Sequence, residues 1–363
     1  MSEKDVGNDL IERLEWHDSK RDQTPHSKAR AVTRRAALGG GAAAFGALML
    51  NPAAQAFAAS DASIFGSQKK YHFVFVNHVT TNPFFTPTQY GIADACALLG
   101  CTSQWTGSAS SLVPQMVTAF NSAITAGADG IACAMIDPKA FTAPTAAALK
   151  KGIPVLAYNA DEPNGRLAYI GQDLFVSGQQ MGMKIKSLVP SGNIALFIAT
   201  PGQANIQPRI DGAISVLKGG SLQYKVVTSG AAVPQELTTV ESFWTGHTTY
   251  KGLFAVDGGT TQSIGQTIQK YKLKGKVVGG GYDLTPITQQ QLAAGNMAFT
   301  IDQQPYLQGF LPVVEMFLYQ ASKHLSGIAD VDTGLKFLYQ STVGPYNNTK
   351  SRYEGTSTKA GVS

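Results

Sequence analysis

Tyr71-His-Phe-Val-Phe-Val76 is an uninterrupted apolar run, and residues 87–99 follow it with helical spacing that stops at Gly100. Such a run predicts a strand buried on both faces of a parallel sheet, because helices cover a sheet of this kind on either side. The pattern then repeats, with predicted strands near residues 102–106, 131–136 and 153–157 and predicted helices over residues 111–126 and 140–151. The stretch from residue 71 to residue 157 therefore predicts strands alternating with helices.

The alternation resumes after Gln172. Further strands are predicted over residues 193–199, 224–228, 252–256, 276–280, 297–302 and 335–341, and further helices over residues 178–188, 207–218, 261–271, 286–294 and 305–325. Strands that alternate with helices of this length favour right-handed crossovers and parallel sheets. Since about ten strands are too many for one modest sheet, we expect an α/β protein with two Rossmann-like lobes.

Composition excludes several classes of protein. Of 363 residues, 44% are hydrophobic and 15% are charged, which is typical of a globular chain. The net charge of +5 is spread without a basic, aromatic-rich block, so we expect no nucleic-acid partner. Cys96, Cys101 and Cys133 are too few and too irregular for a zinc site or a disulfide framework, and no histidine has a partner at metal-ligand spacing. We expect no metal and no cofactor, place Cys133 in the core, and leave open whether Cys96 and Cys101 pair.

Residues 1–58 are predicted to be an export signal with its leader. Basic residues precede an uncharged stretch, residues 36–50, and small-residue cleavage sites follow at Ala54-Gln-Ala56 and Ala56-Phe-Ala58. Arg34-Arg35 resembles a twin-arginine signal, while an ordinary secretory signal stays open. No cysteine lies near the cleavage region, so a lipid anchor is not expected. The pattern favours a periplasmic protein.

Polar and aromatic residues follow the predicted strands, at the carboxyl ends where open parallel sheets bind their ligands. The candidate site residues are Asn82, Phe84, Phe85, Tyr158, Asn159 and Asp161 from the first half and Asn205, Gln207, Asp257, Asp283 and Gln303 from the second. Planar amides and carboxylates bind adjacent hydroxyls, and aromatic rings cover the apolar C–H faces of a sugar. Nothing in this set suggests covalent chemistry. It predicts a sugar-binding protein that is not an enzyme.

These motifs resemble, in order, those of the ribose-binding branch of periplasmic binding proteins, the type I group that serves ABC sugar transporters. The matching stretches are Asn82-Pro-Phe-Phe85, Gly127-Ala-Asp-Gly-Ile131, Gly152-Ile-Pro-Val155, Asp211-Gly212, Phe254-Ala-Val-Asp257, Val277-Val-Gly279 followed by Asp283, and Gly295 with Thr300-Ile-Asp-Gln303. The resemblance implies that Asn82 hydrogen-bonds the sugar, that Phe84 and Phe85 stack on it, and that Asn159, Asp257, Asp283 and Gln303 hold its hydroxyls.

The sequence departs from this family at its arginines. Ala160 and Gln207 stand where the family has guanidinium groups, and Arg209 aligns with a position usually outside the pocket. Two guanidinium groups, each with several hydrogen-bond donors in a fixed geometry, are therefore missing, which argues against ribose as the ligand. Another pentose, a hexose or an acyclic polyol stays open.

The resemblance also implies two discontinuous lobes joined by a three-segment hinge. The amino-terminal lobe comprises residues 70–173 and 304–332, the carboxyl-terminal lobe residues 174–303 and 333–347, and residues 348–363 form a polar tail. Crossings are expected near residues 172–174, 302–305 and 330–333. A ligand contacted by both lobes selects the closed form, and a membrane permease then recognises that form. We expect a monomer.

Three alternatives stay open, one within the class of binding proteins and two from other classes. A nucleoside or an autoinducer needs similar hydroxyl-binding groups. An NAD-dependent oxidoreductase shares the fold class, but the turn after the first strand, residues 78–82, lacks the glycine fingerprint for a pyrophosphate. A regulator of the LacI type needs a helix-turn-helix before the first strand, where this chain has the predicted signal.

Overall fold

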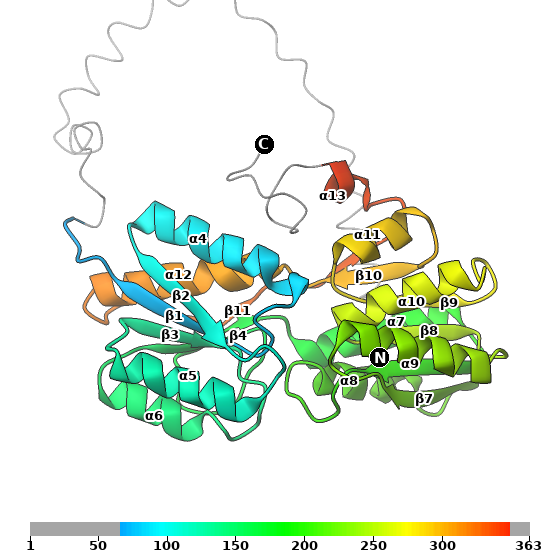
Figure 1. Ribbon diagram of the computed structural model, residues 1–363, viewed down its shortest axis with the longest axis horizontal. Coiled ribbons are helices and arrows are strands. Elements are labelled where there is room, and N and C mark those ends of the chain that lie inside the picture. Colours follow the sequence, from blue (N-terminus) through cyan, green and yellow to red (C-terminus); the bar gives the residue numbers. More distant parts are fainter. Residues whose placement is uncertain (1–65, 349–363) are drawn as a thin grey trace, which may run out of the picture. The chain divides into compact units, whose positions relative to one another are not determined.

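Residues 66–348 are described by a computed structural model (Figure 1). The predicted export signal, residues 1–58, lies outside the described residues, as do residues 349–363 of the predicted tail. Two six-stranded sheets with helices on their faces make up the described part. The fold-class prediction of two α/β lobes is confirmed.

The first sheet has the strand order β11-β5-β4-β3-β1-β2, and all of its strands are parallel. Its strands are β1 (His72–Asn77), β2 (Thr102–Gly107), β3 (Gly130–Cys133), β4 (Val155–Tyr158), β5 (Ala168–Gly171) and β11 (Val331–Asp332). The elements around it are η1 (Pro83–Phe85), α4 (Thr86–Leu99), α5 (Val113–Thr125), α6 (Thr142–Lys150) and α12 (Pro305–Ala321).

Alternation along β1 explains why helices cover both faces of this sheet. Val74 and Val76 pack with Met116 and Phe120 of α5 in one core cluster. Strand residues point alternately to opposite faces, so Phe73 faces the other layer, where α4 and α12 lie (Figure 1). All these side chains are buried, as the apolar run predicts.

The second sheet has the order β12-β10-β9-β8-β6-β7. Its strands are β6 (Gly192–Ile198), β7 (Leu222–Thr228), β8 (Gly252–Ala255), β9 (Val278–Tyr282), β10 (Phe299–Asp302) and β12 (Lys336–Leu338). The helices are α7 (Leu174–Leu188), α8 (Gln207–Leu217), α9 (Val233–Gly246), α10 (Gly258–Lys270), α11 (Pro286–Ala293) and α13 (Gly344–Asn348). Met181 of α7 and Ile210 of α8 pack on one face, and Val240 of α9 and Ile264 of α10 pack on the other.

Two glycines let α7 and α8 approach closely. A Cβ atom on Gly178 would lie 2.2 Å from the carbonyl oxygen of Arg209, and one on Gly212 would lie 2.2 Å from that of Phe175. Real Cβ atoms do not come this near to backbone, so each helix needs glycine where it crosses the other. This contact fixes the first turns of α8, which carry Arg209.

The structure corrects the sequence prediction at the edge of the second sheet. Strand β12 pairs antiparallel with β10, with Ile301 opposite Phe337, so the predicted parallel pairing holds among the described strands except at this edge. The chain enters β12 directly from β11 of the other sheet, with no helix between them, so β12 is not reached by the strand–helix–strand crossover that gives parallel pairing. The short strands β5 and β11 and the helix α9 were not predicted. Helix α7 begins four residues before its predicted start, because Oδ1 of Asp173 accepts a hydrogen bond from the N–H of Val176 at 3.0 Å and caps it.

The chain passes between the two sheets at three places in the described residues. These lie between β5 and α7, between β10 and α12, and between β11 and β12. The crossing segments hold one another. Oγ1 of Thr333 donates to the carbonyl of Gln303 at 2.8 Å, and Nε2 of Gln172 donates to the carbonyl of Gly334 at 3.1 Å.

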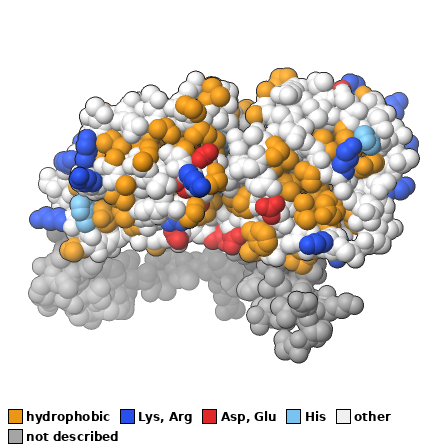
Figure 2. Space-filling model, turned by 90° about the horizontal axis from the view of Figure 1, so that it is seen from below, with side chains coloured by type: hydrophobic (Ala, Val, Ile, Leu, Met, Phe, Trp, Pro, Cys, Tyr) orange, Lys and Arg blue, Asp and Glu red, His pale blue; other side chains and the backbone are white. Residues whose placement is uncertain are grey.

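All three cysteines are buried free thiols. Cys133 of β3 is 0% exposed and belongs to the core, as predicted. Cys96 and Cys101 flank the end of α4 and remain unpaired in the structure. On the face shown in Figure 2, Lys and Arg side chains are scattered, so that this face carries no continuous basic surface.

Candidate functional site

Loops at the carboxyl ends of strands from both sheets line one pocket. The lining comes from the segments after β1, β2 and β4 in the first sheet and after β6 to β10 in the second. Most of the predicted site residues line it: Asn82, Phe84, Phe85, Asn159, Asn205, Asp257, Asp283 and Gln303. The strand-end argument therefore located the pocket.

An aromatic wall is built by the short helix η1. Oδ1 of Asn82 accepts a hydrogen bond from the N–H of Phe84 at 2.9 Å and caps η1. The rings of Phe84 and Phe85 lie edge to face, 4.7 Å apart between centroids. Phe85 is 2% exposed and packs against His78 and Trp105, whereas Phe84 is only half-buried. Phe85 thus anchors the wall, and Phe84 offers its ring at the surface of the pocket.

A chain of amide and carboxyl groups joins the two sides of the pocket. Nε2 of Gln303 donates to Oδ1 of Asp283 at 2.6 Å. Oε1 of Gln303 accepts from Nδ2 of Asn159 at 3.4 Å. Asn159 and Asp283 both have left-handed backbone, with φ of 63° and 70°. Such angles are costly for residues other than glycine, and they gather at functional sites.

Burial raises the pKa of Asp283 to about 6, and the positive charge of Arg209 opposes this shift. A carboxyl with this pKa is mostly ionised at neutral pH and accepts hydrogen bonds from hydroxyl groups. Its neighbour Gln303 occupies Oδ1.

Arg209 lines the pocket, although its alignment predicted a place outside it. The guanidinium is 2% exposed and lies 4.2 Å from the centre of the Tyr282 ring. Nη1 donates to the carbonyl of Val256 at 2.9 Å, and Nη2 donates to Oε1 of Gln172 at 3.3 Å. Nε has no hydrogen-bonding partner among the described residues. The close packing of α7 on α8 explains the correction, because it turns this side chain inward.

Two further carboxyl groups stand on the side of the second sheet. Asp257 caps α10, since its Oδ1 accepts from the N–H of Thr260 at 2.8 Å. Glu236, in the first turn of α9, also lines the pocket and is 3% exposed. Burial raises the pKa of Glu236 to about 9, helped by the charge of Asp257 and a hydrogen bond with it, and burial also raises the pKa of Asp257.

Three predicted site residues do not line this pocket. Tyr158 is wholly buried, and its hydroxyl accepts a hydrogen bond from Nδ2 of Asn77 at 2.8 Å. It is the last residue of β4 and packs in the core against Phe75, whereas Asn159 follows the strand with left-handed backbone and lines the pocket. Gln207 is occupied by its own neighbours, because it accepts from the N–H of Gly202 and donates to Asp211.

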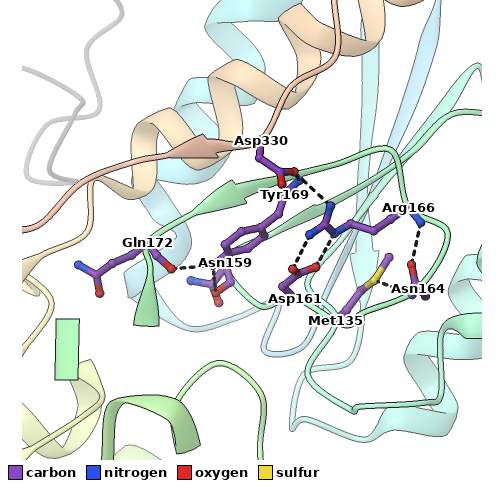
Figure 3. A network of polar contacts seen from close by, with 8 residues as sticks. All are labelled: Met135, Asn159, Asp161, Asn164, Arg166, Tyr169, Gln172 and Asp330. Atoms are coloured by element: carbon purple, nitrogen blue, oxygen red, sulfur yellow. Dashed lines mark hydrogen bonds and ion pairs between the residues drawn. The ribbon is translucent and has the colours of Figure 1, made fainter. Parts of the chain in front are cut away.

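Asp161 is the third of these residues, and it is held by an ion pair. Nη2 of Arg166 donates to Oδ2 of Asp161 at 2.6 Å, and Nη1 of the same side chain binds Asp330 at 3.1 Å (Figure 3). Asp161 lines a separate, more open hollow beside the crossing segments. The hydroxyl of Tyr169 donates toward the carbonyls of Asn159 and Gln172, at 3.3 and 3.1 Å, and so links this network to the pocket.

Sequence reasoning missed His78, Arg209 and Glu236 as lining residues. For Glu236 a signal was present: Val240, Phe243 and Trp244 continue from it at helical spacing, and Pro234 suits the first turn of a helix. For His78 no comparable signal is present in the sequence. Burial lowers the pKa of its imidazole to about 4, so the ring is neutral at neutral pH.

Within residues 66–348, no cluster of three or more His, Cys, Asp or Glu side chains is arranged to hold a metal ion. None of the helices in this range is long and apolar enough to cross a membrane. The chemistry available at the pocket is hydrogen bonding, ring stacking and charge.

Residues 73–323 match the model of the periplasmic binding protein domain. This match spans more than half of the chain and both sheets. The chain belongs to the periplasmic binding protein family. The family places this periplasmic binding protein outside the cytoplasm, and it confirms the resemblance found in the sequence motifs.

This periplasmic binding protein is similar in sequence to the xylose/arabinose-binding protein XylF of Sulfolobus acidocaldarius. The two are 51% identical over 302 residues, which cover 78% of this chain and 75% of the relative. Its fold resembles that of a solute-binding protein from Burkholderia graminis C4D1M solved with D-arabinose, with a TM-score of 0.72 and 24% identity over 77% of this chain and 99% of the other. A glucose-galactose binding protein from Geobacillus stearothermophilus gives a TM-score of 0.69 and 20% identity, over 76% and 100% of the two chains.

Proposed function

We propose that the chain is the solute-binding component of an ABC sugar importer and that its pocket binds a neutral monosaccharide or sugar alcohol. One observation carries this proposal. Buried polar atoms that lack a hydrogen-bonding partner among the described residues gather in this pocket: His78 Nδ1, Asn159 Oδ1, Asn205 Oδ1, Arg209 Nε and Glu236 Oε2. Elsewhere in residues 66–348, only the hydroxyls of Thr88 and Thr145 are buried and without a hydrogen-bonding partner.

The chemistry of these atoms suits hydroxyl groups. A buried polar atom without a partner costs roughly 1–3 kcal/mol, so several together favour a guest that satisfies them at once. Amide oxygens accept and the guanidinium Nε donates, whereas each sugar hydroxyl can do both. The half-buried ring of Phe84 supports the proposal, since it offers a face to the apolar C–H side of a sugar ring.

A pentose is the ligand class that we favour. The relative from Sulfolobus acidocaldarius, 51% identical, is named for xylose and arabinose. The structure from Burkholderia graminis contains D-arabinose. Both support a five-carbon sugar, and Arg209 supplies a guanidinium that the sequence motifs had placed outside the pocket.

Binding is proposed to act through closure. The lobes comprise residues 70–173 with 304–332 and residues 174–303 with 333–347, and the three crossing segments are the hinge. A sugar that contacts both lobes has higher affinity for the closed form and shifts the population toward it. The permease recognises that form, no bond of the sugar is broken, and the protein works as a monomer in the periplasm after export by the signal in residues 1–58.

Calorimetric titration tests the ligand class. We expect D-xylose or L-arabinose to bind more tightly than D-glucose, xylitol or adenosine. Asn159→Ala, which removes a pocket amide, should abolish most of this affinity, and Asn121→Ala, on the exposed side of α5, is the matched control that should not change it. Tight binding of adenosine with no response to any sugar or polyol would contradict the proposal.

A further inference from the structure

Glu236 is the pocket residue whose role neither the sequence motifs nor the structural comparisons explain. It is 3% exposed, it lines the pocket, and its Oε2 has no hydrogen-bonding partner among the described residues. A buried carboxyl oxygen is costly to leave without a partner. Glu236 therefore points to a contact that is made only when the pocket is filled.

The position of the Glu236 carboxyl depends on Gly259. A Cβ atom on Gly259 would lie 2.0 Å from Oε2 of Glu236 and 2.9 Å from Oε1. Any other side chain in this turn of α10 would therefore displace the carboxyl group. Glycine at this place and glutamate in the first turn of α9 together bring the acid to the pocket wall, beside Asp257.

Four titratable or charged groups share the pocket with Glu236. Asp257 lies at the start of α10, Asp283 after β9, Arg209 on α8 and His78 after β1 of the first sheet. Burial keeps His78 neutral at neutral pH, so one guanidinium faces three carboxyl groups in the described lining. Ionising all three in a closed pocket would leave two negative charges uncompensated, which burial strongly disfavours.

We propose, on the basis of the sugar-binding function above, that Glu236 determines ligand specificity as a neutral acid: it retains a proton that it shares with Asp257 while the pocket is empty, and when the sugar binds it redirects this proton to a sugar oxygen that carries no hydrogen, such as the ring oxygen. A ring oxygen only accepts hydrogen bonds, so it needs a donor. Gln207, which the family motif places at a donor position, is turned away toward Gly202 and Asp211. Glu236 supplies the donor from the neighbouring helix.

The raised pKa of Glu236, about 9, agrees with this role and gives it a pH signature. If the protonated acid binds the sugar, affinity falls once the free protein loses the proton. The expected loss is about tenfold between pH 8 and pH 10, because binding is linked to one proton. Near pH 9 the protein should also take up a fraction of a proton when the sugar binds.

The test is calorimetry with whichever of D-xylose and L-arabinose binds more tightly at pH 7. Dissociation constants are measured from pH 6 to pH 10, and at pH 9 the titration is repeated in two buffers of different ionisation enthalpy, which gives the proton uptake. Glu236→Gln has no titratable group at this position, so the loss of sugar affinity at alkaline pH and the proton uptake on binding should both disappear. Glu241→Gln is the matched control, because Glu241 lies on the same helix and pairs with Lys270 at 2.7 Å outside the pocket. It should follow the unaltered protein.

The outcomes separate the two proposals. Failure of every sugar to bind at pH 7 overturns the sugar-binding function, and this inference falls with it. Sugar binding that is independent of pH up to 10 overturns the role of Glu236 alone, and so does an alkaline loss that persists in Glu236→Gln. Since the proton uptake is measured on the unaltered protein, the test does not depend on how well any variant folds.

Discussion

The side-chain oxygen of Gln172 accepts a hydrogen bond from Nη2 of Arg209 at 3.3 Å, and so ties a crossing segment to the wall of the pocket. Through its own Nε2, Gln172 also donates to Gly334 in another crossing segment. A group that contacts Arg209 therefore acts on a side chain bonded directly to Gln172, which lies in one of the segments proposed above as the hinge. Hinges of this kind absorb their motion in a few backbone angles.

Arg209→Lys tests this connection. Lysine keeps the positive charge but lacks the planar guanidinium group, whose two terminal nitrogens donate hydrogen bonds to Val256 and to Gln172. Because hydrogen bonds from a charged group contribute roughly 1.5–3 kcal/mol, we expect pentose affinity to fall at least about tenfold in calorimetry. Wild-type affinity in a folded Arg209→Lys protein would show that the guanidinium group plays no part in binding.

Asp283 should set the acid limit of binding. Its pKa of about 6 means that the carboxylate, which accepts hydroxyl hydrogens, is lost as pH falls below 6. Affinity should therefore decline from pH 7 to pH 5, while Asp283→Asn should bind weakly with little change over this range. Dissociation constants at half-unit steps of pH check this, and an acid decline retained in Asp283→Asn would assign it to another group.

The unliganded protein should lose stability in alkali. Glu236 has a pKa of about 9 in the fold against an ordinary value of 4.5, so the folded state holds this proton more tightly than the unfolded chain. The contribution of this group to the free energy of unfolding is complete below pH 4.5, and it declines as the pH rises toward 9. Glu236→Gln should flatten this decline in thermal unfolding of the unliganded protein, with a higher midpoint than wild type at pH 9. Parallel curves for the two proteins would refute the assignment.

The two neighbouring phenylalanines should separate binding from folding. Phe85 is 2% exposed, and Phe85→Ala should cost about 3–5 kcal/mol of unfolding free energy. Phe84 is half-buried at the pocket, so Phe84→Ala should weaken sugar binding with a clearly smaller loss of stability. Denaturant unfolding and calorimetry on both variants decide this; equal losses of stability would contradict it.

Gly178→Ala should disturb the pocket from the far side of α8. The new methyl group would meet the carbonyl of Arg209 at 2.2 Å and force α7 and α8 apart. Overpacking of this kind costs about 1–3 kcal/mol, and displacing Arg209 should also reduce sugar affinity. Gly246→Ala is the control, since nothing lies within 4 Å of its Cβ position. Similar unfolding midpoints for the two variants would rule out the tight crossing.

The rule that ligands bind at the carboxyl ends of strands was enough to find Asn82, Asp283 and Gln303 in the sequence. It could not give the direction of each side chain. Tyr158 and Asn159 are adjacent at the same strand end, yet only the amide lines the pocket, because the Tyr158 ring packs in the core against Phe75. Asp161 likewise follows the strand but pairs with Arg166, a contact that depends on how the loop folds back.

Arg209 and Glu236 show what depends on packing instead of pattern. The alignment fixed Arg209 on its helix, but its inward direction results from two glycines that let α7 approach α8. Glu236 lies on a helix that was not predicted, and its place at the pocket depends on Gly259 of the next helix. The antiparallel pairing of β12 was also beyond the alternation of strands and helices, which predicts crossovers and says little about a chain end that lacks one.

The burial of every native thiol makes the protein suitable for single-site labelling. Cys96, Cys101 and Cys133 are shielded from reagents that modify surface cysteines, and Ser110, near the pocket, is exposed. Ser110→Cys would therefore accept one environment-sensitive dye while the three native cysteines stay in place. A change in its emission on adding pentose would report the proposed closing motion as an optical signal, and incorporation of more than one dye per chain would show that a native thiol is within reach.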